Sequence, residues 1–223
     1  MPKRALIDHR PWLLASVIAA VAYYFLRDNP IGEVWLIVLK GMGVACLAFY
    51  AMRRGVGPDA QILAAVMLFG ALGDMGIEFD FALGGGLFFV SHVLAIWLYL
   101  RNPRDNPVGS QKALAVVLLL ATPVVSWLLS GDVMVALYGL SLGGMAACAW
   151  MSRFPRYRVG IGAVLFVISD FLIFSRLGPF DLGDLPHYLI WPLYFAGQFM
   201  IATGVVQTLR GEHPGHEKTA QPA

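Results

Sequence analysis

The chain has 223 residues, of which 58% are hydrophobic and only 13% are charged, and its mean hydropathy is +0.69. Soluble domains carry about a quarter of their residues as charged side chains, so this composition excludes that class and predicts an integral membrane protein. The formal net charge of +2 gives no reason to infer a nucleic-acid partner.

Eight apolar segments follow one another along the chain, and each has roughly the length needed to cross a hydrocarbon core of about 30 Å. In chain order they cover residues 11–26, 33–52, 61–79, 83–100, 112–129, 133–151, 159–175 and 187–209. We therefore predict an all-α fold, a polytopic membrane bundle of eight transmembrane helices within residues 1–210. The polar residues 211–223 are predicted to form a disordered cytoplasmic tail.

The basic residues predict how this bundle is oriented, because Lys and Arg beside short loops are retained on the cytoplasmic side. Of the 16 basic residues, all but Arg27, Lys40 and Arg176 fall before segment one, after segment eight, or in alternate connections between them. This alternation predicts that both termini are cytoplasmic, in the inner membrane if the source is a bacterium. The first segment also resembles a secretory signal, whose removal would leave seven spans.

The connections between segments differ in length. Three-residue turns at 80–82 and 130–132 predict antiparallel helical hairpins. The longest outer connection, residues 176–186, is rich in Gly, Pro and Asp, and we expect either a lid or a plain loop. Segments three and seven share a small-residue–Asp pattern, which is compatible with a parallel repeat of two four-helix halves.

Asp74 and Asp170 lie inside the third and seventh segments. A carboxylate at bilayer depth costs several kcal/mol, so its presence indicates chemistry or transport. Both residues lie about five residues from the outer ends of their segments, which corresponds to about 7 Å along a helix. Two ionisable acids at one depth are hard to explain by packing alone, and we predict that they share a functional site.

Further polar side chains fall at a similar depth on other segments. They are Lys40, His92, Tyr194 and Gln198, while Glu78 lies one turn beyond Asp74 on the third segment. Lys40 is expected either to neutralise one aspartate in a buried ion pair or to bind substrate, while Glu78 either joins the site or reaches interfacial water. The other three are candidate supporting residues, with ordinary packing or interhelical hydrogen bonding as the alternative.

A metal site is a second use of the same residues, since catalytic zinc needs three protein ligands and a water. Besides the carboxylates, the sequence offers only His92 and His187 near this depth and no His pair at helical spacing, so we predict neither metal nor cofactor. Tyr188 and His187 are expected at the outer rim as interfacial anchors. Cys46 and Cys148 are expected to be small apolar fillers.

Four short blocks carry a resemblance to a known family. Residues 69–74 read FGALGD, residues 86–92 read GLFFVSH, residues 165–170 read LFVISD, and residues 194–198 read YFAGQ. These blocks resemble the G-D, F-x-x-x-H, L-F-x-x-S-D and Y-x-x-x-Q motifs of the YhhN/TMEM86 family of multi-pass membrane proteins. Lys40 matches a lysine usual in that family's second span, although Gly41 stands where the family has proline.

The resemblance implies hydrolysis of the vinyl ether bond of a lysoplasmalogen, a membrane lysolipid, to a fatty aldehyde and a glycerophospho-base. One carboxylic acid would protonate the vinyl ether, and one carboxylate would stabilise positive charge and activate water, as two carboxylates do at glycosidic bonds. We expect Asp74 and Asp170 in these roles. The expected substrate-binding or supporting residues are Lys40, His92, Tyr194, Gln198, Glu78, Ser169 and Tyr188.

Two other classes of function stay open on the sequence alone. A proton-coupled transporter or lipid flippase also places carboxylates inside the membrane, but it needs access from both faces. A non-enzymatic membrane protein would keep the carboxylates paired and dry. A cavity that joins both aspartates to the bilayer would favour the hydrolase.

Overall fold

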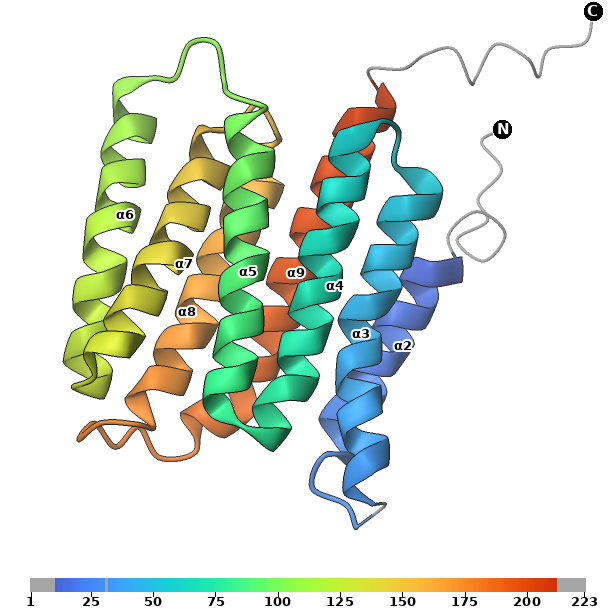
Figure 1. Ribbon diagram of the computed structural model, residues 1–223, viewed down its shortest axis with the longest axis vertical. Coiled ribbons are helices and arrows are strands. Elements are labelled where there is room, and N and C mark those ends of the chain that lie inside the picture. Colours follow the sequence, from blue (N-terminus) through green and yellow to red (C-terminus); the bar gives the residue numbers. More distant parts are fainter. Residues whose placement is uncertain (1–10, 31, 212–223) are drawn as a thin grey trace, which may run out of the picture.

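The structure is a computed structural model that describes residues 11–30 and 32–211 (Figure 1). The helices are α2 (Pro11–Leu26), α3 (Glu33–Arg54), α4 (Pro58–Phe79), α5 (Phe81–Leu100), α6 (Gly109–Ser130), α7 (Val133–Met151), η1 (Arg156–Gly160), α8 (Ile161–Ser175) and α9 (Leu185–Gly211). No strand occurs in the described ranges, so the all-α prediction is confirmed. The predicted disordered tail, beyond Gly211, lies outside the described residues.

Seven helices of the described chain are long and apolar enough to cross a membrane, with η1 and α8 counted as one. The remaining apolar helix, α2, has 16 residues. At a rise of 1.5 Å per residue it covers about 24 Å, less than the hydrocarbon core of about 30 Å. The eighth crossing and the orientation of the termini therefore stay predictions.

Helix ends differ from the predicted ones where polar residues continue or cap a helix. The three-residue turn predicted at 80–82 is a single residue, because the Asp80 carboxylate accepts a hydrogen bond from the Leu83 amide at 2.7 Å and so begins α5 at Phe81. Three helices, α4, α6 and α9, begin two or three residues earlier than predicted, since hydropathy does not register their polar or proline-containing first turns. The start of the seventh predicted span is the π-helical segment η1.

Figure 1 shows α2, α3 and α4 along one side of the bundle, the α6–α7 hairpin along the other, and α5, α8 and α9 between them. Between the two halves of the chain, α5 packs on α7 and α9 packs on α3. If α2–α5 and α6–α9 are equivalent halves, α5 corresponds to α9 and α3 corresponds to α7. The α5–α7 contact is then the counterpart of the α9–α3 contact. The arrangement is therefore compatible with the parallel repeat, which stays a prediction.

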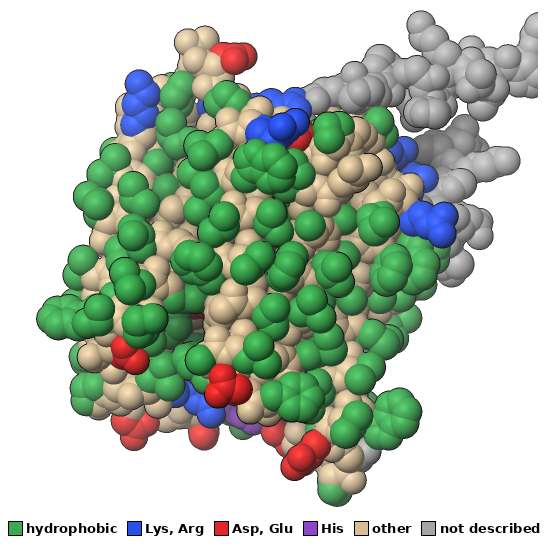
Figure 2. Space-filling model, in the orientation of Figure 1, with side chains coloured by type: hydrophobic (Ala, Val, Ile, Leu, Met, Phe, Trp, Pro, Cys, Tyr) green, Lys and Arg blue, Asp and Glu red, His purple; other side chains and the backbone are tan. Residues whose placement is uncertain are grey.

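The two ends of the bundle carry opposite charge, as Figure 2 shows, with Lys and Arg gathered at the top and Asp and Glu at the bottom. We call the end with the α3–α4, α5–α6 and α7–α8 connections the basic end, and the opposite one the acidic end. The acidic end is the one predicted to face outward, because basic residues favour the cytoplasm.

A buried asparagine joins the two halves at the basic end. Asn102 donates through Nδ2 to Asp59 Oδ2 at 2.8 Å and to the Leu98 carbonyl at 2.9 Å, and its Oδ1 accepts from Arg153 Nε at 2.6 Å. The network ties α4 and the end of α5 to the segment after α7. The basic end is thus fixed by polar contacts.

We expect the α4–α5 hairpin to depend on glycine at position 84. A Cβ atom there would lie 2.3 Å from Ile77 Cγ1 and 2.5 Å from the Ile77 nitrogen, so the Gly84→Val substitution should lower the free energy of unfolding by about 1–3 kcal/mol. Gly86→Val is the control, because a Cβ at Gly86 meets nothing within 4 Å. The measurement is denaturant unfolding in detergent. Equal stability of the two variants would contradict the close approach.

Candidate active site

Asp74 and Asp170 are both buried, with 3% and 4% of their surface exposed. Asp74 lies five residues before the end of α4 at Phe79, and Asp170 lies five residues before the end of α8 at Ser175. Both helices end at the acidic end of the bundle (Figure 1). The two carboxylates therefore lie at one depth, about 7 Å from the helix ends.

Each carboxylate accepts a hydrogen bond from a tyrosine on a different helix. The Tyr194 hydroxyl of α9 donates to Asp74 Oδ2, and the Tyr138 hydroxyl of α7 donates to Asp170 Oδ2, both at 2.8 Å. Gln198, one turn after Tyr194, donates through Nε2 to the Tyr194 hydroxyl at the long distance of 3.5 Å. Two tyrosine–carboxylate pairs thus occupy the same layer of the bundle.

Aromatic rings pack against Tyr194 of the Asp74 pair. The ring centroid of Phe88 on α5 is 5.8 Å from that of Phe166 on α8 and 5.7 Å from that of Tyr194. Phe166 and Tyr194 are 5.0 Å apart by the same measure. Each aspartate is hydrogen-bonded to its own tyrosine and not to the other aspartate. Aromatic rings occupy this layer of the bundle. The expected cavity between Asp74 and Asp170 stays a prediction.

His92 reaches the same layer from α5. Its Nδ1 lies 3.2 Å from Ser141 Oγ, and its ring centroid is 5.2 Å from those of Tyr138 and Phe166. Only 1% of the residue is exposed, and its Nε2 has no hydrogen-bond partner in the described chain. A buried ring nitrogen without a partner is unusual in a native structure and indicates a place for a water or a ligand.

Lys40 forms an ion pair with Glu78, at 2.5 Å between Nζ and Oε1. The two side chains are 14% and 38% exposed, and the Lys40 ammonium also lies 5.9 Å from the centroid of the Tyr23 ring. Glu78 is one turn beyond Asp74 on α4, and Lys40 is near enough to Asp74 to interact electrostatically. Lys40 was expected to pair with an aspartate, but its ion pair forms with Glu78, and Asp74 accepts its hydrogen bond from Tyr194.

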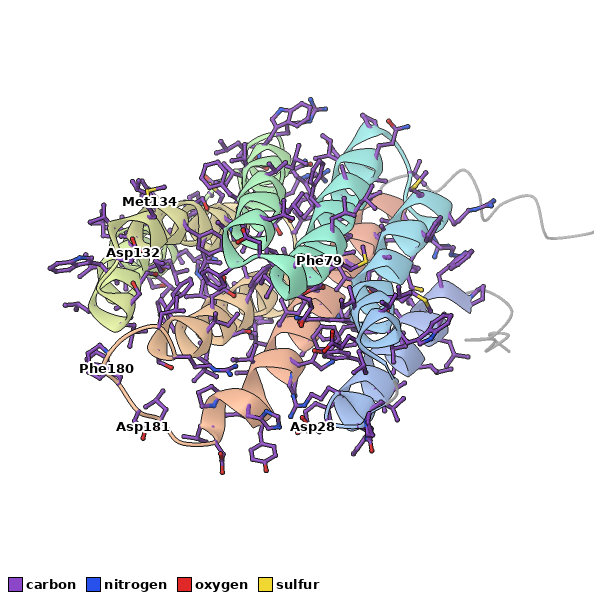
Figure 3. All side chains as sticks on the ribbon, turned by 60° about the horizontal axis from the view of Figure 1, so that its bottom comes forward. Asp28, Phe79, Asp132, Met134, Phe180 and Asp181 are labelled. Carbon is purple, nitrogen blue, oxygen red and sulfur yellow. The ribbon has the colours of Figure 1, made fainter. Side chains whose placement is uncertain are left out.

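Two predicted supporting residues lie apart from these contacts. The Ser169 hydroxyl donates to the Ile190 carbonyl at 2.9 Å, which joins α8 to α9. Tyr188 is 54% exposed and contacts the ring of His187, whose Nε2 lies 3.3 Å from Asp28 Oδ2. Figure 3 looks onto the acidic end and shows Asp28 at its rim. Ser169 therefore takes part in helix packing, and Tyr188 lies at the rim of the acidic end.

Two cavities of about 260 Å³ each lie elsewhere. One is an open pocket lined by Ser175 and by residues of the connection from Arg176 to Pro186, where Figure 3 labels Phe180 and Asp181. The other is an apolar groove near the basic end, formed by α5, α6 and α7 and including Cys148. Neither cavity is lined by Asp74 or Asp170, and whether the 176–186 connection acts as a lid stays open.

Tyr138 is the residue that the sequence reasoning missed. It lies five residues after the start of α7 at Val133, the same depth as Asp170 from its helix end. Counting depth for every polar residue of the sixth segment, tyrosine included, would have found it. No group of three His, Cys, Asp or Glu residues is placed to hold a metal ion within the described residues.

Comparisons with known proteins give the family and distant curated relatives. The YhhN family model matches residues 35–205. Lysoplasmalogenase of Mycobacterium bovis is 27% identical over 179 residues, which cover 74% of this chain and 68% of the relative. Lysoplasmalogenase TMEM86A of Bos taurus is 26% identical over 220 residues, covering 89% and 90%. No solved structure matches the chain.

The Lys40–Glu78 pair should be coupled in stability. Lys40→Met leaves the glutamate without its cation, so the single substitution should cost more stability than the same substitution made on a Glu78→Gln background. We expect a coupling energy of about 1–3 kcal/mol in a double-mutant cycle of detergent unfolding measurements. Additive effects, within about 0.5 kcal/mol, would show that the pair contributes nothing.

Proposed function

Because the chain belongs to the YhhN family, we propose that it is a membrane-embedded hydrolase that cleaves the vinyl ether bond of lysoplasmalogen-like lysolipids. Curated relatives that match most of the chain are named lysoplasmalogenase. The observation that carries the proposal is the pair of buried carboxylates at one depth, each bonded to a tyrosine. The products are a fatty aldehyde and a glycerophospho-base.

The proposed reaction needs one proton donor and one stabilising carboxylate. Transfer of a proton to the β-carbon of the vinyl ether leaves an oxocarbenium ion, which an adjacent carboxylate stabilises. Water then adds to the α-carbon and returns a proton, and the hemiacetal separates into aldehyde and alcohol. One water is consumed and no electrons are exchanged, so no cofactor is required.

Asp74 and Asp170 are the proposed proton donor and charge-stabilising base, in an order that we leave open. The tyrosine hydroxyls hold both carboxylates at fixed positions, as supporting groups of a catalytic residue do. Lys40 is proposed to set the charge around Asp74 rather than to bind lipid phosphate, because its ammonium already contacts Glu78. His92 is proposed to hold a water through its free Nε2.

The depth of the carboxylates fits the position of the scissile bond. In a lysoplasmalogen the vinyl ether joins the hydrocarbon chain to the glycerol, so it lies just below the head group. Both aspartates lie about 7 Å from the acidic ends of their helices, with Tyr188 and His187 at the rim above them. A head group at the rim would therefore place the ether near the carboxylates.

Replacing either carboxylate by an amide should remove most activity. Asp74→Asn and Asp170→Asn keep the side-chain shape but abolish proton transfer and negative charge, so each should reduce vinyl ether hydrolysis by about 10²- to 10⁴-fold. The double variant should be scarcely worse than the poorer single variant. The assay is aldehyde release by purified protein, with Asp105→Asn, in the exposed α5–α6 connection, as the control.

Wild-type protein that releases no aldehyde from any of several lysoplasmalogens would contradict the proposed function. Near-normal release by either single variant would instead reject the two-aspartate mechanism.

Tyr138 should matter for activity more than for folding. Tyr138→Phe removes the hydroxyl that donates to Asp170 but keeps the ring that packs on Phe174 and His92, and we expect about a 10-fold loss of kcat. The measurement is kcat beside thermal stability in detergent. Unchanged kcat in the folded variant would limit Tyr138 to packing.

A further inference from the structure

The side of α5 that faces α7 is packed near the basic end and open near the acidic end. A Cβ at Gly144 of α7 would lie 3.3 Å from the Ile96 side chain, and His92, one turn along, contacts Ser141. Gly85 lies seven residues before His92, which is two turns and nearly the same side of the helix. A Cβ at Gly85 meets no atom within 4 Å. The space beside Gly85, on the side of α5 that faces α7, is therefore open, and we call it the crevice.

Gly84 and Gly85 are neighbours in α5, but packing requires glycine only at Gly84. Gly84 is required by the close approach of Ile77. Gly85 has no such neighbour, although glycine within a helix costs about 1 kcal/mol relative to alanine. Figure 2 shows a hollow between α5 and the α6–α7 hairpin in the lower half of the molecule. Packing therefore does not require glycine at position 85, and the glycine leaves the crevice open.

Polar groups lie deeper on the same side of α5. His92 lies two turns deeper on the same side of α5, and its ring contacts Tyr138 of α7 and Phe166 of α8. The Nε2 atom of His92 has no partner within the described chain. Tyr138 in turn donates to Asp170. The contacts of His92 with Tyr138 and of Tyr138 with Asp170 thus link this side of α5 to the carboxylate.

We propose that the crevice between α5 and α7 at Gly85 is the lateral entrance through which the single hydrocarbon chain of a lysolipid reaches Asp170. The crevice opens among exposed apolar side chains such as Phe89, which is 44% exposed, and thus toward lipid. Its width comes from the absence of one side chain, which suits one hydrocarbon chain rather than two. This inference rests on the proposed function, because it assigns the route of that substrate.

The first test is a volume series at Gly85. Gly85→Ala, Gly85→Leu and Gly85→Trp should lower kcat/KM for a lysoplasmalogen progressively, with a loss of about 10- to 100-fold at tryptophan. The matched controls are Gly86→Ala, Gly86→Leu and Gly86→Trp, since Gly86 is exposed and a Cβ there also meets nothing within 4 Å. The Gly86 series should change kcat/KM by less than about twofold.

A second test does not depend on catalysis. Gly85→Cys and Gly86→Cys are each made in a chain in which Cys46 and Cys148 are replaced by alanine, and each is labelled with a lipid-soluble maleimide in nanodiscs. Added lysophosphatidylcholine should slow labelling at position 85 at least about threefold and leave position 86 unchanged. A diacyl phosphatidylcholine at the same concentration should protect neither.

The two tests separate the entrance from the activity. The proposed entrance would be overturned if lysophosphatidylcholine does not slow labelling of Gly85→Cys and the folded Gly85→Trp variant keeps a normal kcat/KM. Equal losses of kcat/KM in the Gly85 and Gly86 series would also overturn the proposed entrance. Protection at position 85 in a protein that hydrolyses no lysoplasmalogen would support a single-chain lipid site while rejecting the proposed reaction. Protection by diacyl lipid would replace the substrate entrance by a site for bulk lipid.

Discussion

A carboxylate buried among apolar side chains must receive a hydrogen bond, and this requirement organises the acidic half of the bundle. Asp74 receives it from Tyr194, and Asp170 from Tyr138. Each bond joins helices that are distant in sequence or belong to different hairpins, α4 with α9 and α7 with α8. An unsatisfied carboxylate in hydrocarbon costs several kcal/mol, so these bonds also select which helices lie beside one another.

Small residues permit the close packing that holds the tyrosines and rings in place. A Cβ at Gly70 would lie 3.2 Å from Gln198 Nε2, and one at Gly73 would lie 2.8 Å from the Phe88 ring. Gly162 and Gly197 let the backbones of α8 and α9 approach closely. Such contacts are the usual basis of helix association in membranes, where no hydrophobic force acts between helices. Gly85 is different because no atom packs on it.

The sequence predicted the helices and the depth of the polar residues better than their partners. Hydropathy located every membrane-length helix, and equal distance from the helix ends placed Asp74 and Asp170 in one layer. It did not show that Lys40 pairs with Glu78, because the rotation of α3 against α4 depends on tertiary packing. Tyr138 was missed because tyrosine is common at membrane interfaces and carries no signal of its own. Ser169 was expected at the site, but its hydroxyl bonds to the backbone of α9.

The central claim is that a carboxylic acid of the protein delivers a proton to carbon. The most direct measurement is hydrolysis in D₂O, with immediate reduction of the aldehyde to the alcohol and determination of the configuration at the deuterated carbon next to the former carbonyl. An acid held by a tyrosine delivers its proton to one face, so the account predicts one deuterium of a single configuration. A racemic product would contradict it, because protonation would then take place on a released enol in water.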